Sequence, residues 1–398
     1  MKSMLKKFFF FVIFLISSFY TQAQVYNAAY QAVVNQTSQV NITEDLTQFE
    51  ALGVKRRGTP ALQNTLDWLK TKYLSYGYSA SQLQEFSYTY SGSTSICKNL
   101  VVTKIGTLYP NTFLIVCGHY DTISGTGTND NGSGVASILE TARLLQNIPT
   151  EYSIKFINFS GEEDGLKGSQ NYVTSVVNST SPKMNIRLVF NLDEVGGVAG
   201  MLNNNITCER DTSSPTTNNA VSNTFTNELI NCVGLYTSLN TTLSYAYASD
   251  YMSFQSNNEI ITGFFETNET THKHTTTDLL VNMDPVYNYK VAMATVGATL
   301  HFAKASSSTL EQTNFNNNFQ VTIFPNPTSE KLYINMGNLP EGEFNLSLID
   351  SNGKRVLKKT ISNNKQLIEE NIKNLAKGIY IGILQSDKKS VNFKFIIQ

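Results

Sequence analysis

Six ionisable residues in this 398-residue chain have the types and contexts of metal-dependent chemistry. Five of them lie a short distance beyond an apolar run, the sixth precedes a helical pattern, and two glutamates stand side by side. Imidazole and carboxylate ligands suit zinc, and an open coordination position would make such a site catalytic. So many carboxylates would repel one another unless a cation compensated them. The six residues are His119, Asp121, Asp130, Glu162, Glu163 and Asp193.

Three apolar, β-branched runs must position these side chains. Residues 113–117 precede the histidine, residues 154–159 precede the glutamate pair, and residues 188–192 precede Asp193. Asp130 lies among glycines just before a helical pattern, where the backbone can turn sharply and bring the carboxylate close to a metal. Strands that alternate with helices predict an α/β domain with a helix-covered, largely parallel sheet. Ligands of such sheets bind at the carboxyl ends of the strands, so we expect these residues at one rim.

Each residue alone is weak as a signal of function. A Glu-Glu-Asp run such as residues 162–164 is usually a solvated turn, and an Asp before Asn-Gly usually serves turn chemistry. The prediction of a catalytic site depends on their conjunction and on their shared position after strands.

Five short motifs occur in order along the chain. They are Gly118-His119-Tyr120-Asp121, residues 130–136, residues 160–169, Asn191-Leu192-Asp193 and His274-Thr275-Thr276-Thr277-Asp278. Together they resemble the co-catalytic di-zinc aminopeptidase family, typified by bacterial leucyl aminopeptidases. The resemblance covers about residues 95 to 303, and its specificity comes from the order of all five motifs.

The resemblance implies a pair of zinc ions per chain that share one carboxylate. Asp130 would bridge the two ions, with His119 and Asp193 completing one site and Glu163 and His274 completing the other. His272 is a rival ligand, and we prefer His274 because His-Thr-x-x-Asp is the pattern of the family.

The resemblance also implies roles beside the metals. Asp121 would hold the far nitrogen of His119. Glu162 would take a proton from the bridging water and pass it to the leaving amine. Tyr245 and Tyr247 are both candidates to stabilise the oxyanion, and their spacing before Ser249-Asp250 does not select one. Glu194 is left without a role.

These features predict a secreted, zinc-dependent aminopeptidase, a hydrolase that removes residues from the amino-terminal ends of peptides and proteins. The nearest rival is a glutaminyl cyclase, which shares the fold but typically binds one zinc. The intact His274 and residues 165–169 favour hydrolysis. A catalytically dead surface-binding module is a rival of another class, but such a protein should have lost ligands or the base.

The amino-terminal residues predict export. Lysines precede an apolar run at residues 8–16, and Thr21-Gln22-Ala23 offers small residues before a cleavage point, which indicates a signal peptide over residues 1–23. We expect no transmembrane segment in the mature chain. Charged residues are 15% of the chain and the net charge is −1, so composition gives no case for nucleic acid as a partner. An oxidising compartment permits disulfides among Cys97, Cys117, Cys208 and Cys232, including a loop closed by the last two.

The composition changes after the predicted peptidase domain of residues 24–304. Residues 305–320 predict a linker, and residues 321–398 alternate as in a small all-β sandwich. Phe324-Pro325-Asn326-Pro327, Gly378-Ile379-Tyr380 and the closing residues 394–398 resemble the sorting domain of the type IX secretion system. The alternative is an accessory binding module. The resemblance implies secretion to the medium or cell surface through the periplasm of a Gram-negative bacterium, with outer-membrane secretion machinery as the partner.

Overall fold

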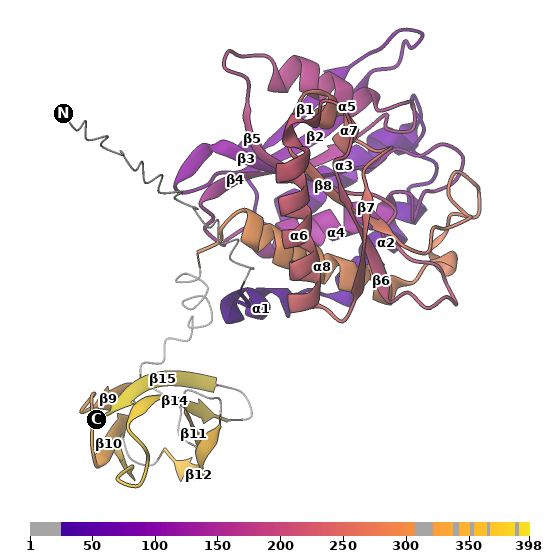
Figure 1. The fold of residues 1–398 in the computed structure, drawn as a ribbon. Helices are drawn as coiled ribbons and strands as arrows, with labels where there is room; N and C mark the ends of the chain where they lie inside the picture. Colours follow the sequence, from indigo (N-terminus) through magenta and orange to yellow (C-terminus); the bar gives the residue numbers. More distant parts are fainter. Residues whose placement is uncertain (1–24, 307–320, 337–341, 351–353, 364–366, 387–389) are drawn as a thin grey trace, which may run out of the picture. The chain divides into compact units, whose positions relative to one another are not determined.

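The computed structural model describes residues 25–306, 321–336, 342–350, 354–363, 367–386 and 390–398. The predicted signal peptide, residues 1–23, lies outside the described residues, and so does most of the predicted linker. The chain divides into two compact units, Met1–Ser307 and Ser308–Gln398 (Figure 1).

The first unit is built on an eight-stranded sheet with the order β1-β2-β4-β3-β5-β8-β6-β7. Its central strands β4, β3, β5 and β8 run parallel to one another. On one side β2 pairs antiparallel with β4 and with β1, and on the other side β6 pairs antiparallel with β8 and parallel with β7. The strands are β1 (Leu83–Tyr88), β2 (Cys97–Lys104), β3 (Tyr109–His119), β4 (Tyr152–Phe159), β5 (Asn185–Leu192), β6 (Asn205–Arg210), β7 (Asn240–Tyr245) and β8 (Ile261–Glu266). The predicted α/β fold with a largely parallel sheet is confirmed.

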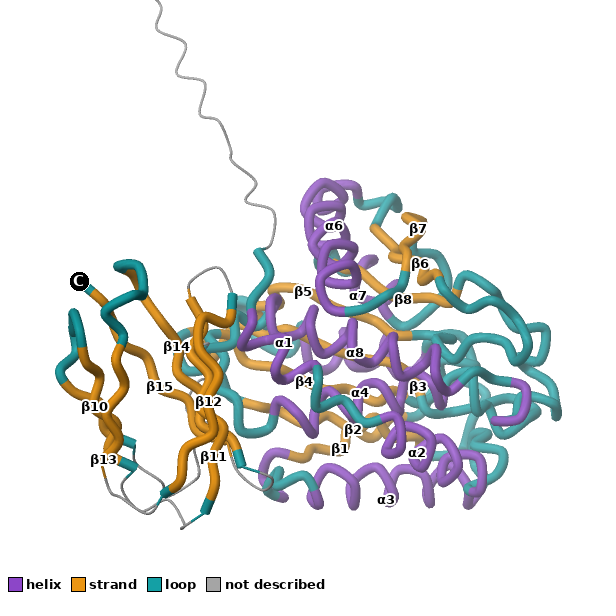
Figure 2. Tube along the Cα trace, turned by 90° about the horizontal axis from the view of Figure 1, so that it is seen from below, coloured by secondary structure: helices purple, strands orange, loops and turns teal. Residues whose placement is uncertain are grey.

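Helices cover both faces of this sheet, as Figures 1 and 2 show. Helix α8 contacts α4 and α6 over one face, with α1, α2 and α3 packed beside them, and α5 and α7 cover the other face. The helices are α1 (Ala28–Val34), α2 (Gln39–Ala51), α3 (Pro60–Ser75), α4 (Gly132–Leu145), α5 (Lys167–Tyr172), α6 (Asn219–Tyr236), α7 (Tyr251–Ser256) and α8 (Pro285–Phe302). The two-sided cover explains why β4 is buried at every residue after Tyr152, as a central parallel strand should be.

Local sequence signals set where the helices begin. Thr59 caps α3 by accepting a hydrogen bond from the Leu62 N–H, and Pro60 follows at the first helical position. Asn131 caps α4 in the same way, with its side-chain oxygen 3.0 Å from the Gly134 nitrogen. The cap at Asn131 therefore fixes the backbone position of the residue that directly follows Asp130.

All four cysteines lie in the described residues, and all four are buried without forming a disulfide bond. The loop closure between Cys208 and Cys232 that the sequence permitted is therefore not formed. Within the described residues, no helix combines the length and the apolarity that a membrane crossing requires.

The second unit is an all-β structure with two antiparallel sheets, as predicted. One sheet has the order β13-β10-β9 and the other β12-β11-β14-β15. The strands are β9 (Thr322–Phe324), β10 (Lys331–Asn335), β11 (Glu343–Asp350), β12 (Arg355–Ser362), β13 (Leu367–Asn371), β14 (Gly378–Gln385) and β15 (Ser390–Ile397). Residues from both sheets share one apolar core, which includes Leu332, Leu346 and Phe395. The Asn326 side chain accepts a hydrogen bond from the Ile396 N–H, which joins the Phe-Pro-Asn-Pro motif to the last strand.

Candidate active site

Three neighbouring parallel strands deliver the predicted residues to one edge of the sheet. Strand β3 lies between β4 and β5, with Cys117 opposite Ile157 on one side and Asn191 on the other. Strand β3 ends at His119, Asp193 follows the last residue of β5, and Glu162 follows β4 by three residues. Because the strands are parallel and their registers are aligned, their carboxyl ends lie together at one rim of the sheet.

Asp130 lies between two histidines and presents a different carboxylate oxygen to each. Its Oδ1 atom is 3.2 Å from the Nε2 atom of His119, and its Oδ2 atom is 3.1 Å from the Nε2 atom of His274. Two groups that could hold a metal ion therefore share this residue. In each group the donor atoms lie within 4.8 Å of one another; the groups are His119, Asp130 and Asp193, and Asp130, Glu163 and His274.

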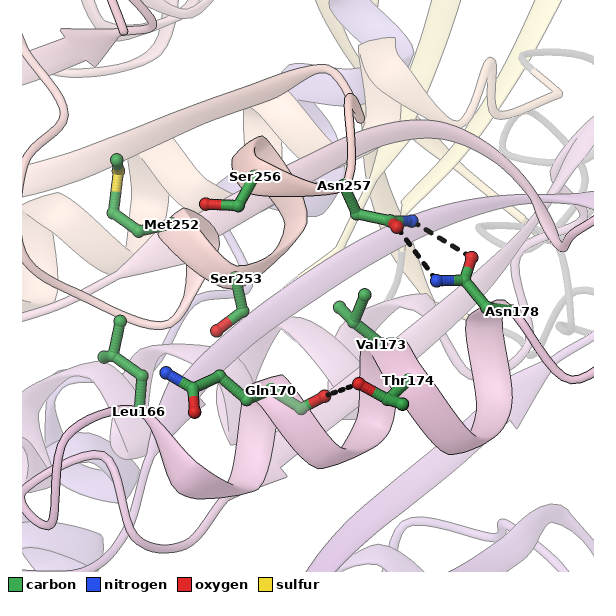
Figure 3. Close-up of a pocket in the computed structure, with 9 residues that line it drawn as sticks. All are labelled: Leu166, Gln170, Val173, Thr174, Asn178, Met252, Ser253, Ser256 and Asn257. Carbon is green, nitrogen blue, oxygen red and sulfur yellow. Dashed lines mark hydrogen bonds between the residues drawn. The ribbon is translucent and has the colours of Figure 1, made fainter. Parts of the chain in front are cut away.

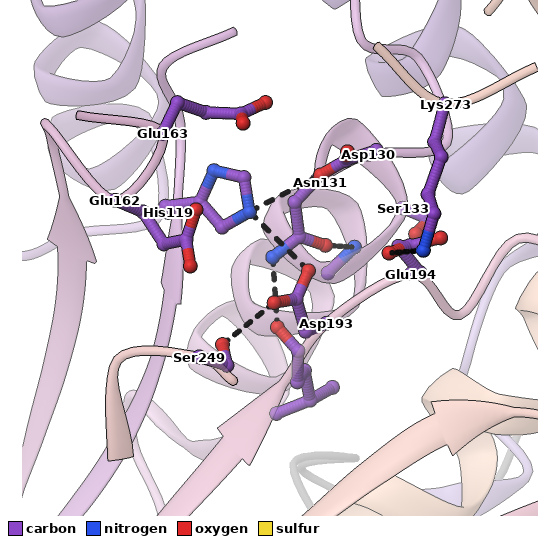
Figure 4. A network of polar contacts seen from close by, with 12 residues as sticks. His119, Asp130, Asn131, Ser133, Glu162, Glu163, Asp193, Glu194, Ser249 and Lys273 are labelled. Atoms are coloured by element: carbon purple, nitrogen blue, oxygen red, sulfur yellow. Dashed lines mark hydrogen bonds and ion pairs between the residues drawn. The ribbon is translucent and has the colours of Figure 1, made fainter. Parts of the chain in front are cut away.

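The first group is buried and has a second layer of hydrogen bonds. The Nε2 atom of His119 is 3.2 Å from Oδ1 of Asp193 (Figure 4). The Ser249 hydroxyl donates to the other oxygen of Asp193 at 2.6 Å, and the Asn191 amide donates to Ser249. These bonds fix the orientation of the Asp193 carboxylate toward the histidine.

The second group is more open to solvent. The Nε2 atom of His274 is 3.0 Å from Oε2 of Glu163, and the His274 side chain is 49% exposed. His274 has a positive φ of 58°, in the left-handed region that residues other than glycine rarely adopt. His272, the rival ligand, instead faces the Thr277 hydroxyl at 2.8 Å and belongs to neither group.

Asp278 ties the loop that carries His274 to the loop that carries Asp130. Its two carboxylate oxygens accept hydrogen bonds from the backbone N–H groups of Asn129 and Asp130, at 2.8 and 3.0 Å. The spacing of His274 and Asp278 therefore has a structural basis. Asp278 holds the backbone of Asp130, and His274 contacts the side chain of the same residue.

Asp121 differs in one respect from the role that was expected of it. The carboxylate oxygen Oδ1 is 3.7 Å from Nδ1 of His119, whereas the main-chain oxygen of Asp121 is 3.2 Å from that nitrogen. The carboxylate instead accepts hydrogen bonds from the backbone N–H groups of Glu162 and Glu163, at 3.2 and 3.3 Å. Asp121 thus braces both the histidine and the turn that carries the two glutamates.

The electrostatics of the site fit a divalent cation. Burial and nearby carboxylates raise the pKa of Glu162 well above its usual range and that of Glu163 to about 10. Burial opposes ionisation of Asp130, but hydrogen bonds from His119 and His274 hold its pKa below its usual range. Carboxylates that suppress one another's ionisation at such close range are compensated by a cation. Two imidazoles and three carboxylates are a donor set that zinc accepts.

A cavity of about 300 Å³ opens onto both groups. Tyr247 lines it, whereas Tyr245 ends β7 opposite Arg210 and is not part of the cavity wall. The wall also contains residues to which sequence reasoning gave no role, chiefly Glu194, Glu209, Ser249, Phe265 and Lys273. Ser249 had a signal in the Ser-Asp pair beside the tyrosines, but Glu209 comes from β6 and belongs to no motif.

A second hollow lies between α5 and α7 and is distinct from this cavity. Figure 3 shows its nine lining residues, which include Leu166, Gln170, Met252 and Asn257. None of the nine is an acid, a base or a histidine, so the hollow lacks the groups that the chemistry at the rim requires.

Comparison with known families places both units. The model of Peptidase family M28 matches residues 99–299, about half of the chain. The model of the secretion system C-terminal sorting domain matches residues 322–398. All the candidate ligands lie within the first match.

Individual relatives agree with the family match but cover only parts of the chain. Aminopeptidase YwaD of Bacillus subtilis is 43% identical over 82 residues, which are 20% of this chain and 18% of that protein. The chain spans less than half of the length of the curated relatives that it matches first.

Solved structures share the fold. The LapA aminopeptidase of Legionella pneumophila aligns with a TM-score of 0.60 and 20% identity, covering 76% of this chain and 80% of that one. A glutaminyl cyclase of Macrostomum lignano aligns equally well, with a TM-score of 0.60 and 14% identity over 71% of this chain and 96% of that one. The fold therefore does not decide between hydrolysis and cyclisation.

Proposed function

The chain belongs to peptidase family M28, and from this premise we propose that it is a zinc-dependent aminopeptidase that holds two zinc ions. The observation that carries the proposal is the position of Asp130, whose two oxygens face two separate histidine–carboxylate pairs. We assign His119, Asp130 and Asp193 to one ion, and Asp130, Glu163 and His274 to the other. When bound, the zinc ions would polarise the scissile carbonyl and lower the pKa of the attacking water.

Glu162 is the proposed general base. Its backbone N–H is held by Asp121, and its side chain lines the cavity beside the ligands without belonging to either group. The Glu162 carboxylate takes one proton from the attacking water and delivers it to the nitrogen of the leaving amine as the C–N bond breaks. The carboxylate is thus regenerated at the end of the cycle.

Tyr247 is the proposed oxyanion donor, because it lines the cavity and Tyr245 does not. Its hydroxyl would donate a hydrogen bond to the oxygen that gains negative charge as the carbonyl is attacked. Removing one such donor typically lowers kcat about 10²- to 10³-fold. We therefore expect a loss of that size for Tyr247→Phe and little change for Tyr245→Phe, in assays of the same aminoacyl anilide.

The size of the cavity favours an exopeptidase. About 300 Å³ lies at the small end of ligand pockets, which suits one residue better than an extended peptide. A free α-amine should therefore be required, and an N-acetylated peptide should resist cleavage.

Substitution of the base tests the mechanism most simply. Glu162→Gln keeps the shape of the side chain and removes its ability to take a proton, so kcat should fall about 10²- to 10⁴-fold with little change in KM. Zinc content should be unchanged. Glu163→Gln is the matched control, because it replaces a proposed ligand and should lower zinc content. Near-normal turnover by Glu162→Gln, or rapid cleavage of N-acetylated peptides, would refute this mechanism.

The rival functions make different demands on the site. A glutaminyl cyclase with one zinc needs only one of the two groups, and a dead binding module needs neither. Both groups and Glu162 are present together, which supports hydrolysis. A peptide with N-terminal glutamine separates the reactions, because hydrolysis releases glutamine whereas cyclisation releases ammonia.

The C-terminal match implies secretion or display at the cell surface. We propose a route with two steps, in which the signal peptide leads to the periplasm of a Gram-negative cell and the second unit engages outer-membrane secretion machinery. All proposed ligands lie in the first unit. A chain that ends at Ser306 should therefore hydrolyse substrate normally and remain in the periplasm, as fractionation of expressing cells would show.

A further inference from the structure

The cavity continues past the proposed metal ligands to a second wall of charged and aromatic side chains. Glu194, Glu209, Tyr247, Phe265 and Lys273 make up this wall. In the proposed function, the α-amine and the carbonyl of the first substrate residue lie at the ligands. Its side chain must then occupy the rest of the same cavity and face this wall.

One carboxylate oxygen of Glu194 has no hydrogen-bond partner in this wall. The residue is 7% exposed, and its Oε1 atom is 3.3 Å from Nζ of Lys273 (Figure 4). Its Oε2 atom is buried and has no hydrogen-bond partner among the described residues. A buried carboxylate oxygen without a donor is costly, so this atom marks a position where a bound molecule can supply one.

The balance of charge in the wall points to a cationic donor. The wall contains two carboxylates, Glu194 and Glu209, and a single ammonium group, that of Lys273, which pairs with Glu194. Lys273 also pairs with the half-exposed Glu269, so its charge is shared with a residue outside the cavity. A bound cationic group would supply the hydrogen-bond donor that Oε2 of Glu194 lacks within the described part of the chain.

The aromatic part of the wall is compatible with a cation. The Nζ atom of Lys273 already lies 5.9 Å from the centre of the Phe265 ring, over its face. Ring faces attract ammonium and guanidinium groups, and long charged side chains bury their alkyl stems along apolar surface. A side chain with a long apolar stem and a charged end therefore suits both parts of the wall.

We propose that Glu194 is a specificity-determining residue that makes this site prefer peptides with a cationic N-terminal side chain, lysine or arginine. The inference rests on the proposed aminopeptidase function. Glu194 accepts a hydrogen bond from the charged end of that side chain through Oε2, and the backbone amine remains at the ligands. Lys273 limits the preference, because it competes for the same carboxylate.

The test compares lysyl and norleucyl p-nitroanilides, which differ only in the terminal ammonium group. In the wild-type enzyme kcat/KM should favour the lysyl substrate by about 10- to 100-fold, the range for a hydrogen bond to a charged group. Glu194→Gln should reduce this ratio about tenfold or more. Glu269→Gln removes a charge from the outer side of the same lysine, and as an exposed pair it should change the ratio by less than about threefold.

A second measurement separates this inference from the proposed function. Calorimetric binding of L-lysine and L-norleucine to the zinc-loaded protein needs no turnover. If no substrate is hydrolysed but L-lysine binds more tightly to the wild type than to Glu194→Gln, the aminopeptidase proposal fails and the pocket assignment stands. A preference for norleucyl or glutamyl substrates, or a lysyl preference that persists in Glu194→Gln, would overturn the assignment.

Discussion

The two halves of the candidate metal centre share Asp130 but differ in burial and in support. The half with His119 and Asp193 is buried throughout, whereas the half with Glu163 and His274 reaches solvent. His119 and Asp193 come from the ends of adjacent parallel strands, and Ser249 holds Asp193. Glu163 and His274 come from loops. Ligands on rigid elements with hydrogen-bonded support bind metal with more exact geometry, so we expect the buried half to hold zinc more tightly.

Loss of the shared residue should have the largest effect. Asp130→Ala removes the proposed ligand that both halves share and leaves His119 and His274 without their common partner. Zinc content should fall from about two ions per chain, as in a paired site, to less than one, and hydrolysis should fall to background. Elemental analysis of the purified variant measures the first quantity. Retention of one tightly bound ion would show that the halves are more independent than Asp130 suggests.

Replacing one histidine at a time should separate the halves. His119→Ala opens a buried position beside three carboxylates, so it should lower both zinc content and the melting temperature. His274→Ala changes a half-exposed loop residue, so it should lower zinc content with little effect on the melting temperature. Thermal unfolding of the two variants, each with and without zinc, checks the difference. Equal losses of stability would contradict the asymmetry.

A smaller effect should follow from loss of the support behind Asp193. Ser249→Ala removes the hydroxyl that donates to Oδ2, and loss of such a partner typically weakens metal binding about 10- to 100-fold. Ser253→Ala is the matched control, because its buried hydroxyl faces Ser169 and no proposed ligand. Competition with a chelator of known affinity measures both variants. Equal zinc affinity in the two variants would show that the Ser249 hydroxyl does not support the metal site.

The smallest predicted effect concerns the pH dependence of stability in the metal-free protein, where loss of zinc in acid cannot contribute. Burial lowers the pKa of His301, which lies in α8 and belongs to neither candidate group, from 6.5 to about 4. Between these values the unfolded chain binds more protons, so the free energy of unfolding falls as the pH drops from about 6.5 to 4. His301→Gln should lose less stability over this interval in urea titrations of metal-free protein. An unchanged pH dependence would mean that other groups control acid unfolding.

The same contrast separates what the sequence could predict from what it could not. His119 and Asp193 follow apolar runs whose ends mark the edge of the sheet, so pattern alone predicted that they meet. His274 lies in a polar loop without periodicity, and only the family resemblance selected it over His272. Strand β6, which supplies Glu209, gave no strand pattern because polar residues such as Thr207 and Glu209 are buried in it beside Ile206 and Cys208.

Contacts that depend on tertiary packing could not be predicted either, because no local sequence pattern links the residues that make them. The choice between Tyr245 and Tyr247 depends on where β7 ends relative to the cavity, which their spacing before Ser249 does not specify. The partner of Glu194 lies 79 positions along the chain, at Lys273. The carboxylate of Asp121 lies 3.7 Å from the far nitrogen of His119, and the sequence gave no sign that it also accepts hydrogen bonds from the N–H groups of Glu162 and Glu163.

The number of zinc ions per chain tests the central claim most directly. The protein would be stripped with a chelator, and zinc would be returned in steps while bound metal and hydrolysis of an aminoacyl anilide are followed together. If both halves bind zinc through Asp130, binding should continue to about two ions per chain in two steps of unequal affinity. Saturation at a single ion with full activity would contradict the shared centre and favour the glutaminyl cyclase alternative.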